Sequence, residues 1–128
     1  MIGLVAAAAV PAAVSRAGTQ PPALLRADIA EWNLVPSTGI VHAGLVRITA
    51  RNLGLNTHQL VLVRTARFDP VLTLDGDHAA GRAVAHPIIV EPGQSRSITT
   101  RLAPGNYLLI DNLPWHYWRG TSAAFVVR

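Results

Sequence analysis

The chain has 128 residues and no cysteine, which excludes disulfides, thiolate nucleophiles, zinc fingers and iron–sulfur clusters. Half of the residues are hydrophobic and 14% are charged, which is the composition of one folded domain rather than of a disordered chain. The formal charge is +4, but the eleven basic residues are single, scattered arginines, so no basic run or stripe indicates nucleic-acid binding.

The chain begins with an apolar run, "IGLVAAAAVPAAV" (2–14), which is too short for a membrane helix of ~20 residues. It is typical of a signal-peptide core, with small residues before a cleavage point after Ala17. No lysine or arginine precedes the run, so a disordered alanine-rich leader is the alternative. We expect a signal peptide at 1–17, a linker at 18–24 and one domain at 25–128. The mature protein would then be periplasmic, at the cell surface or secreted, with no stable membrane span.

From about Leu24 the hydrophobic pattern repeats every two residues, which predicts strands. The segments "ADIAEWNL" (27–34) and "LVRITARN" (45–52) alternate, and Trp32 is expected in the core. The segment "HQLVLVRT" (58–65) is almost continuously apolar. Such a run predicts a strand that is covered on both faces.

Further strands are predicted along the rest of the chain. The segment 71–74 is a short candidate, and 75–85 is expected to be a loop or one helical turn. Two or three strands are expected in 86–112, separated by Pro92-Gly93 and Pro104-Gly105 turns, and a last strand covers 122–128. Seven or so short strands separated by turns predict an all-β sandwich.

Two long segments resemble the cupredoxins, the family of small blue-copper domains. In "VRITARNLGLNTHQLVLV" (46–63), a strand ends at Asn52 and a loop leads to His58, as before the first histidine ligand of that family. "EPGQSRSITTRLAPGNYLLIDNLPWHYWRGT" (91–121) resembles its C-terminal half, with two Pro-Gly turns before the ligand loop. The resemblance runs from about Asp28 to Val127. It implies a Greek-key β-sandwich of about seven to eight strands.

The resemblance also implies a ligand set in which both sulfur atoms have been replaced. His58 and His116 match the two histidines, Asp111 stands at the cysteine position and Thr121 at the methionine position. The spacing Asp111-x4-His116-x4-Thr121 is that of the family. Trp115 replaces the glycine that usually precedes the second histidine. The implied site is therefore a degenerate type 1 copper site.

Replacement of thiolate by carboxylate has a direct chemical consequence. The sulfur-to-copper charge transfer disappears, hard oxygen favours Cu(II) over Cu(I), and fast electron transfer is expected to be lost. His58, Asp111 and His116 would suit a colourless Cu(II) site, or a two-histidine-one-carboxylate site for zinc or iron. The alternatives are structural: His58 as a turn histidine, and Asp111 bonded to backbone amides in a tight turn with Asn112.

The remaining histidines match no ligand position of the family. His42, His78 and His86 are expected on the surface or in loops. A second metal site at "DGDH" (75–78) rests on that short motif alone.

An aromatic cluster of Trp115, Tyr117 and Trp118 surrounds His116. It predicts a docking surface for a protein partner, because aromatic side chains dominate interface energetics. Trp118 is the ring expected to cap the core instead. Three functions remain open: an exported metal-binding protein, a metal-free module that binds a protein or ligand through this aromatic end, and a metalloenzyme. No second acid or base is evident near the loop, so an enzyme is not expected.

Overall fold

The computed structural model describes Gly3 and residues 20–128, and the predicted signal peptide lies outside these residues except for Gly3. The described part contains eleven strands and no helix, and hence no helix able to cross a membrane. Eight strands have at least three residues. The strands are β1 (Ala23–Ala30), β2 (Asn33–Pro36), β3 (Ile40–Val41), β4 (Gly44–Asn52), β5 (His58–Thr65), β6 (Leu74–Asp75), β7 (His78–Ala79), β8 (Ile88–Val90), β9 (Ser95–Leu102), β10 (Gly105–Asp111) and β11 (Ser122–Val127).

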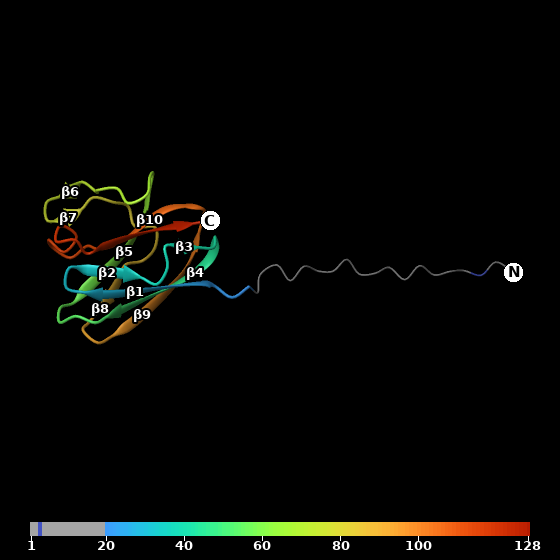
Figure 1. The fold of residues 1–128 in the computed structure, drawn as a ribbon, viewed down its shortest axis with the longest axis horizontal. Helices are drawn as coiled ribbons and strands as arrows, with labels where there is room; N and C mark the ends of the chain where they lie inside the picture. The colour runs from blue at the N-terminus through green and yellow to red at the C-terminus, as the bar shows by residue number, and fades with distance from the viewer. Residues whose placement is uncertain (1–2, 4–19) are drawn as a thin grey trace.

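Two sheets form the sandwich. The first sheet has the order β2-β1-β4-β9, and the second has the order β3-β11-β10-β5-β8. The β1–β4 and β11–β3 pairs are parallel, and all other pairs in the two sheets are antiparallel. β6 and β7 form a separate hairpin, which Figure 1 shows at the same end of the molecule as the red loop after β10.

The main core lies between the two sheets and follows from the period-two pattern. In β1 and β4 every second residue is buried, while the arginines and Asp28 between them face solvent. Phe125 and Leu109 of the second sheet pack into the same cluster. Burial of large apolar side chains on one face of each sheet is the main stabilising term of such a sandwich.

The second sheet is also covered on its outer face. Val61 and Val63 of β5 pack there with Leu108 and Ile110 of β10 and with Ala79 of β7. β5 and β10 are therefore buried on both faces, which explains their nearly continuous apolar sequences. The prediction for 58–65 is confirmed.

The prediction of one strand over 27–34 is wrong. The chain turns back at Glu31-Trp32, so that β1 and β2 form a hairpin in which Ala30 lies opposite Asn33. Trp32 takes a left-handed conformation, with φ of 60°. In this segment, apolar residues fall at odd positions up to Ile29 and at even positions from Ala30 to Leu34, and this change of phase coincides with the turn. Trp32 lies outside the core clusters, so its predicted core position is also wrong.

The segment 71–85 also differs from expectation. Only Leu74 of the predicted strand 71–74 is in a strand, and Val71 is highly exposed. The predicted loop or helical turn instead contains the β6–β7 hairpin, in which Gly76 has the positive φ of 64° that the tight turn requires.

Candidate metal centre

His58, Asp111 and His116 come together at one end of the sandwich. His58 is the first residue of β5, and Asp111 is the last residue of β10. These strands are paired, with Asp111 opposite Leu60, so the ladder places the carboxylate beside the start of β5. His116 lies in the loop between β10 and β11. The imidazole centroids of His58 and His116 are 5.5 Å apart.

One carboxylate oxygen joins the two histidines. Oδ2 of Asp111 lies 2.5 Å from Nδ1 of His58 and 2.6 Å from Nδ1 of His116. His58 and Asp111 are completely buried, and His116 is partly buried. Both histidines therefore present the same ring nitrogen to one buried oxygen atom.

The other oxygen of Asp111 accepts hydrogen bonds from the backbone. Oδ1 accepts hydrogen bonds from the N–H groups of Gln59 at 3.0 Å and Leu113 at 3.2 Å. The sequence left open whether Asp111 holds a turn or faces the histidines. The structure shows both, because each oxygen has its own partners.

The three side chains have the donor set and the proximity of a metal site. Among the described residues they are the only three His, Asp or Glu side chains whose potential ligand atoms all lie within 4.8 Å of one another. A bound ion would replace the two hydrogen bonds, with His58 and His116 holding it through Nδ1 and Asp111 through Oδ2. Imidazole and carboxylate are ligands that Cu(II), zinc and iron accept.

Thr121 closes the loop at the position where the resemblance places a methionine. Its carbonyl accepts a hydrogen bond from the N–H of Asp111 at 3.0 Å, and its own N–H donates to the carbonyl of His116 at 3.3 Å. The side chain is fully buried, and its hydroxyl has no hydrogen-bond partner within the described part of the chain. A threonine hydroxyl is a poor axial ligand compared with a thioether.

Known proteins were compared with the chain by sequence and by structure. No protein-family profile matches the sequence, and no curated protein matches it. The solved structures that resemble it include a dithionite-reduced auracyanin from Roseiflexus castenholzii, with a TM-score of 0.58, 22% identity and coverage of 82% of this chain and 96% of that one. Auracyanin B has a TM-score of 0.59 and 24% identity, with coverage of 85% and 91%. A copper-containing nitrite reductase from Thermus scotoductus has a TM-score of 0.57 and 15% identity, with coverage of 85% of this chain but 31% of that one.

The chain has a cupredoxin-like fold. The all-β sandwich expected from the resemblance is thereby confirmed. The chain contains no cysteine, so no thiolate is available to this group of side chains.

The ligand loop of this cupredoxin-like domain is tied to the β6–β7 hairpin. The side chain of Asn112 bonds to both backbone groups of Ala79, at 2.8 and 3.3 Å. The N–H of Trp115 donates to the carbonyl of Asp77 at 2.8 Å. Trp115 has a φ of 65°, a conformation that suits the glycine of the family and costs a bulky residue ~1 kcal/mol or more. The loop is thus held in place by the neighbouring hairpin.

The loop before His58 is organised by Asn52, which is completely buried. Its Nδ2 donates to the carbonyls of Asn56 at 2.7 Å and Val90 at 2.9 Å, while its Oδ1 accepts from the N–H of Gly54. An asparagine at the end of β4 therefore fixes the loop that leads to His58.

Two residues near the site were missed by sequence reasoning. Trp32 packs edge-on against His116, and Glu31 places Oε1 3.6 Å from Nε2 of His58. Both belong to the β1–β2 turn, which lies more than twenty residues before His58 in the sequence. No local motif marks them, because only the pairing of β1 with β4 brings this turn to the site.

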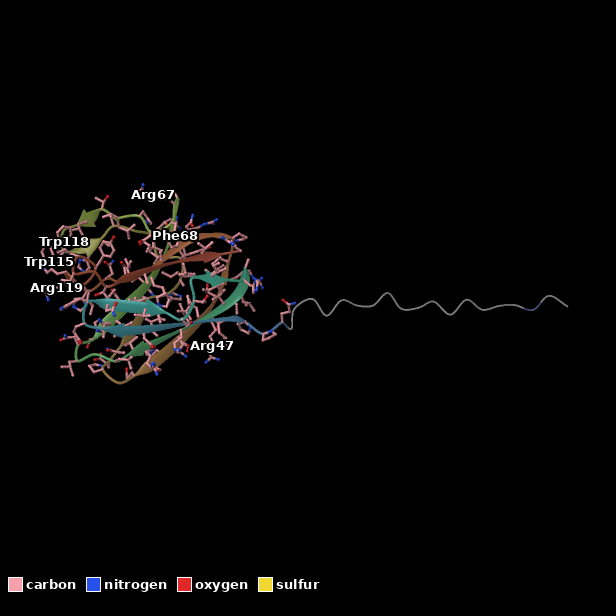
Figure 2. All side chains as sticks on the ribbon, viewed as in Figure 1. Arg47, Arg67, Phe68, Trp115, Trp118 and Arg119 are labelled. Atoms are coloured by element: carbon pink, nitrogen blue, oxygen red, sulfur yellow. The ribbon has the colours of Figure 1, made fainter. Side chains whose placement is uncertain are left out.

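The aromatic surface around His116 is partly as expected. Trp115 and Trp118 are 49% and 67% exposed, and Figure 2 shows them with Arg119 at one end of the sandwich. The prediction that Trp118 caps the core is wrong. Tyr117 instead packs against the outer core cluster, and its hydroxyl accepts a hydrogen bond from the N–H of Leu72 at 2.8 Å.

The other histidines do not belong to the site. His42, His78 and His86 are exposed, as expected. Nδ1 of His78 lies 2.5 Å from Oδ1 of its neighbour Asp77. Within the residues that the structure describes, Asp75 does not join them in a three-ligand group, so the "DGDH" motif forms no second convergent site.

Proposed function

We propose that the chain is an exported cupredoxin-like protein that binds Cu(II) in a non-blue site made by His58, Asp111 and His116. The observation that carries the proposal is the approach of two Nδ1 atoms to one buried carboxylate oxygen. Such an arrangement brings two imidazole nitrogens and one carboxylate oxygen together at a largely buried point. We propose a binding role and not an enzyme.

The donor set favours the oxidised metal. Among divalent first-row ions Cu(II) binds nitrogen and oxygen sites most tightly, and without thiolate or thioether the affinity for Cu(I) is low. Bound copper would supply a one-electron centre biased towards Cu(II). The residues of this chain would hold it: Asp111 through Oδ2, and the histidines through the Nδ1 atoms that already face that oxygen.

Export and a protein partner belong to the same proposal. Export is supported by the apolar leader followed by small residues. A partner at the Trp115/His116/Tyr117/Trp118 end is supported by the exposed rings beside His116. Nucleic acid is not proposed as a partner, because the arginines are scattered.

Calorimetry with Cu(II) tests the site directly. The wild type, His58→Ala and His116→Ala should be compared, with the exposed His42→Ala as the matched control. We expect the first two variants to lose most of the affinity and the control to keep it. Electron paramagnetic resonance of the loaded wild type should show Cu(II) with nitrogen ligands and without the narrow copper hyperfine splitting of a blue site. Equal binding by all four proteins would place copper elsewhere.

A metal-free docking module is the second candidate. It is favoured by the two exposed tryptophans at the ligand end, since large apolar surfaces on a soluble domain often mark an interface. A wild type that remains metal-free after purification and after copper titration would support this candidate over the first.

A further inference from the structure

The carboxylate of Glu31 reaches the far side of the His58 ring. Its Oε1 accepts hydrogen bonds from the N–H groups of Leu55 and Asn56, both at 2.7 Å, and lies 3.6 Å from Nε2 of His58. That nitrogen is completely buried and has no hydrogen-bond partner within the described residues. The imidazole therefore stands between two carboxylates, Asp111 at Nδ1 and Glu31 at Nε2.

The position of Glu31 matters once an ion occupies Nδ1. Nδ1 then gives its lone pair to the ion, the proton of the ring sits on Nε2, and that N–H dipole faces the carboxylate of Glu31. Without an ion, Nδ1 lies 2.5 Å from Oδ2 of Asp111, a contact that needs a proton on one of these two atoms. Carboxylates in this position orient a ligating histidine and increase the basicity of its donor nitrogen.

We propose that Glu31 is a positioning residue for the metal centre, which holds His58 with its proton on Nε2 and directs Nδ1 to the ion. This proposal rests on the proposed function. It assigns a role to a residue outside the ligand loops, on the hairpin turn between β1 and β2. The carboxylate adds negative charge beside the ring, and it therefore strengthens Cu(II) binding over Cu(I) binding.

The neighbouring backbone is adapted to this carboxylate. Gly54 lies against the head of Glu31, and a Cβ atom at this position would come within 2.6 Å of Oε2 and 2.7 Å of Cδ. Gly54 is not among the glycines with a positive φ, and the three atoms nearest to such a Cβ all belong to the flexible head of Glu31. Alanine at this position would displace the carboxylate without removing it.

The experiment compares Glu31→Gln and Gly54→Ala with the wild type, using the full chain and Cu(II) alone. Glutamine keeps an oxygen that accepts from Leu55 and Asn56 but loses the charge, and alanine moves the charge away. Glu91→Gln is the matched control, because the Glu91 carboxylate accepts a hydrogen bond from the Thr57 hydroxyl at 2.6 Å on the same loop. Thermal unfolding without metal shows whether each variant is folded.

The readouts are Cu(II) affinity and electron spin echo modulation from the remote imidazole nitrogens. We expect Glu31→Gln and Gly54→Ala to weaken Cu(II) binding about tenfold. This is the lower end of the range of losses seen when a residue that orients a metal ligand is changed. The modulation of one of the two remote nitrogens should shift, because the hydrogen bond of its N–H weakens. A purely structural role would lower the unfolding temperature but leave the modulation unchanged. The control should match the wild type in affinity and modulation.

Three results would overturn the proposal. The first is a folded Glu31→Gln variant with unchanged Cu(II) affinity and unchanged modulation. If His58→Ala still abolishes binding in that case, the proposed function is kept and only the role of Glu31 is rejected. The second is an equal loss of Cu(II) affinity in Glu31→Gln and Glu91→Gln, because the cause would then be the net charge of the protein and not the position of Glu31. A wild type that binds no Cu(II) would remove both proposals together.

Discussion

The indole ring of Trp32 lies edge-on to the imidazole of His116, with ring centroids 4.9 Å apart and planes at 84°. The guanidinium of Arg119 lies over the same indole, with Cζ 4.4 Å from its centroid. Two segments far apart in the sequence thus bring a cation and an imidazole against the same indole ring. Trp32 is an internal reporter beside the candidate metal centre.

Cu(II) binding should therefore quench the fluorescence of Trp32. Paramagnetic Cu(II) quenches nearby indoles efficiently, and Trp32 contacts one of the proposed ligands. We expect Trp32→Phe to remove most of the quenching that copper causes in the wild type, while binding measured by calorimetry persists. Trp118→Phe, at the most exposed of the three tryptophans, is the control. Greater loss of quenching in Trp118→Phe than in Trp32→Phe would argue against copper beside His116.

Restoring sulfur should create a blue centre. The wild type should show no intense visible band with Cu(II), because no thiolate is present. Asp111→Cys, alone or with Thr121→Met, should generate one, since the histidines remain on either side of position 111. Without metal, these variants should lose ~1–3 kcal/mol of stability, because the amides of Gln59 and Leu113 lose their acceptor.

Visible spectroscopy of the copper-loaded variants checks this prediction. If neither variant turns blue although both remain folded, the loop cannot hold copper in the trigonal arrangement of a type 1 site.

Copper binding should compete with protons. Both Nδ1 atoms face Asp111 and must be free of protons before they can coordinate. We expect the affinity for Cu(II) to fall on acidification, by up to ~tenfold per pH unit for each imidazole that takes up a proton. Calorimetry at several pH values, in buffers of different ionisation enthalpy, measures the number of protons released. A pH-independent affinity would contradict coordination by both histidines.

The ion pair of Asp28 with Arg51 should make stability depend on pH. Arg51 donates through Nε at 3.0 Å and Nη2 at 2.8 Å, and these bonds lower the pKa of Asp28 from its usual value of 3.8. The folded state thus has the lower pKa, so the stabilisation is complete above about pH 5 and is lost as the pH falls through the folded-state pKa.

Asp28→Asn should therefore reduce the free energy of unfolding by ~0.5–1 kcal/mol at pH 7, as expected for a partly exposed pair. The difference from the wild type should shrink below about pH 4. Urea unfolding at pH 7 and pH 3 measures it, with the exposed Asp69→Asn as the control. A difference that grows on acidification would have the wrong sign.

The strands were predictable where their two faces differ or are both buried. The alternation in 45–52 and the continuous apolar run in 58–65 correspond to β4 and β5 almost residue for residue. The approach of His58, Asp111 and His116 was also predictable, because the matched segments carry both the strand ends and the spacing. That these three residues bind metal stays a prediction.

The β1–β2 turn shows in the sequence only as a change of phase. Ile29 and Ala30 are both apolar, so the apolar positions change from odd to even numbers there, and no glycine or proline stands between Ala30 and Asn33. The turn is stabilised from outside, by the amides of Leu55 and Asn56 that bind Glu31. These contacts join segments that are far apart in the sequence. The positions of Glu31 and Trp32 beside the site could therefore not be predicted from the sequence around them.

The hydrogen bond from the N–H of Asp111 to the carbonyl of Thr121 continues the β10–β11 ladder to the base of the ligand loop. Residues 112–120 therefore form an insert whose two ends leave adjacent positions of a finished sheet. Natural or engineered changes within it, including changes of length, can alter the donor that His116 supplies, while His58 and Asp111 stay on the paired strands β5 and β10. The sequence of this loop can therefore change during evolution without a change in the sheets. Its contacts with the β6–β7 hairpin limit which loop sequences the fold can accept.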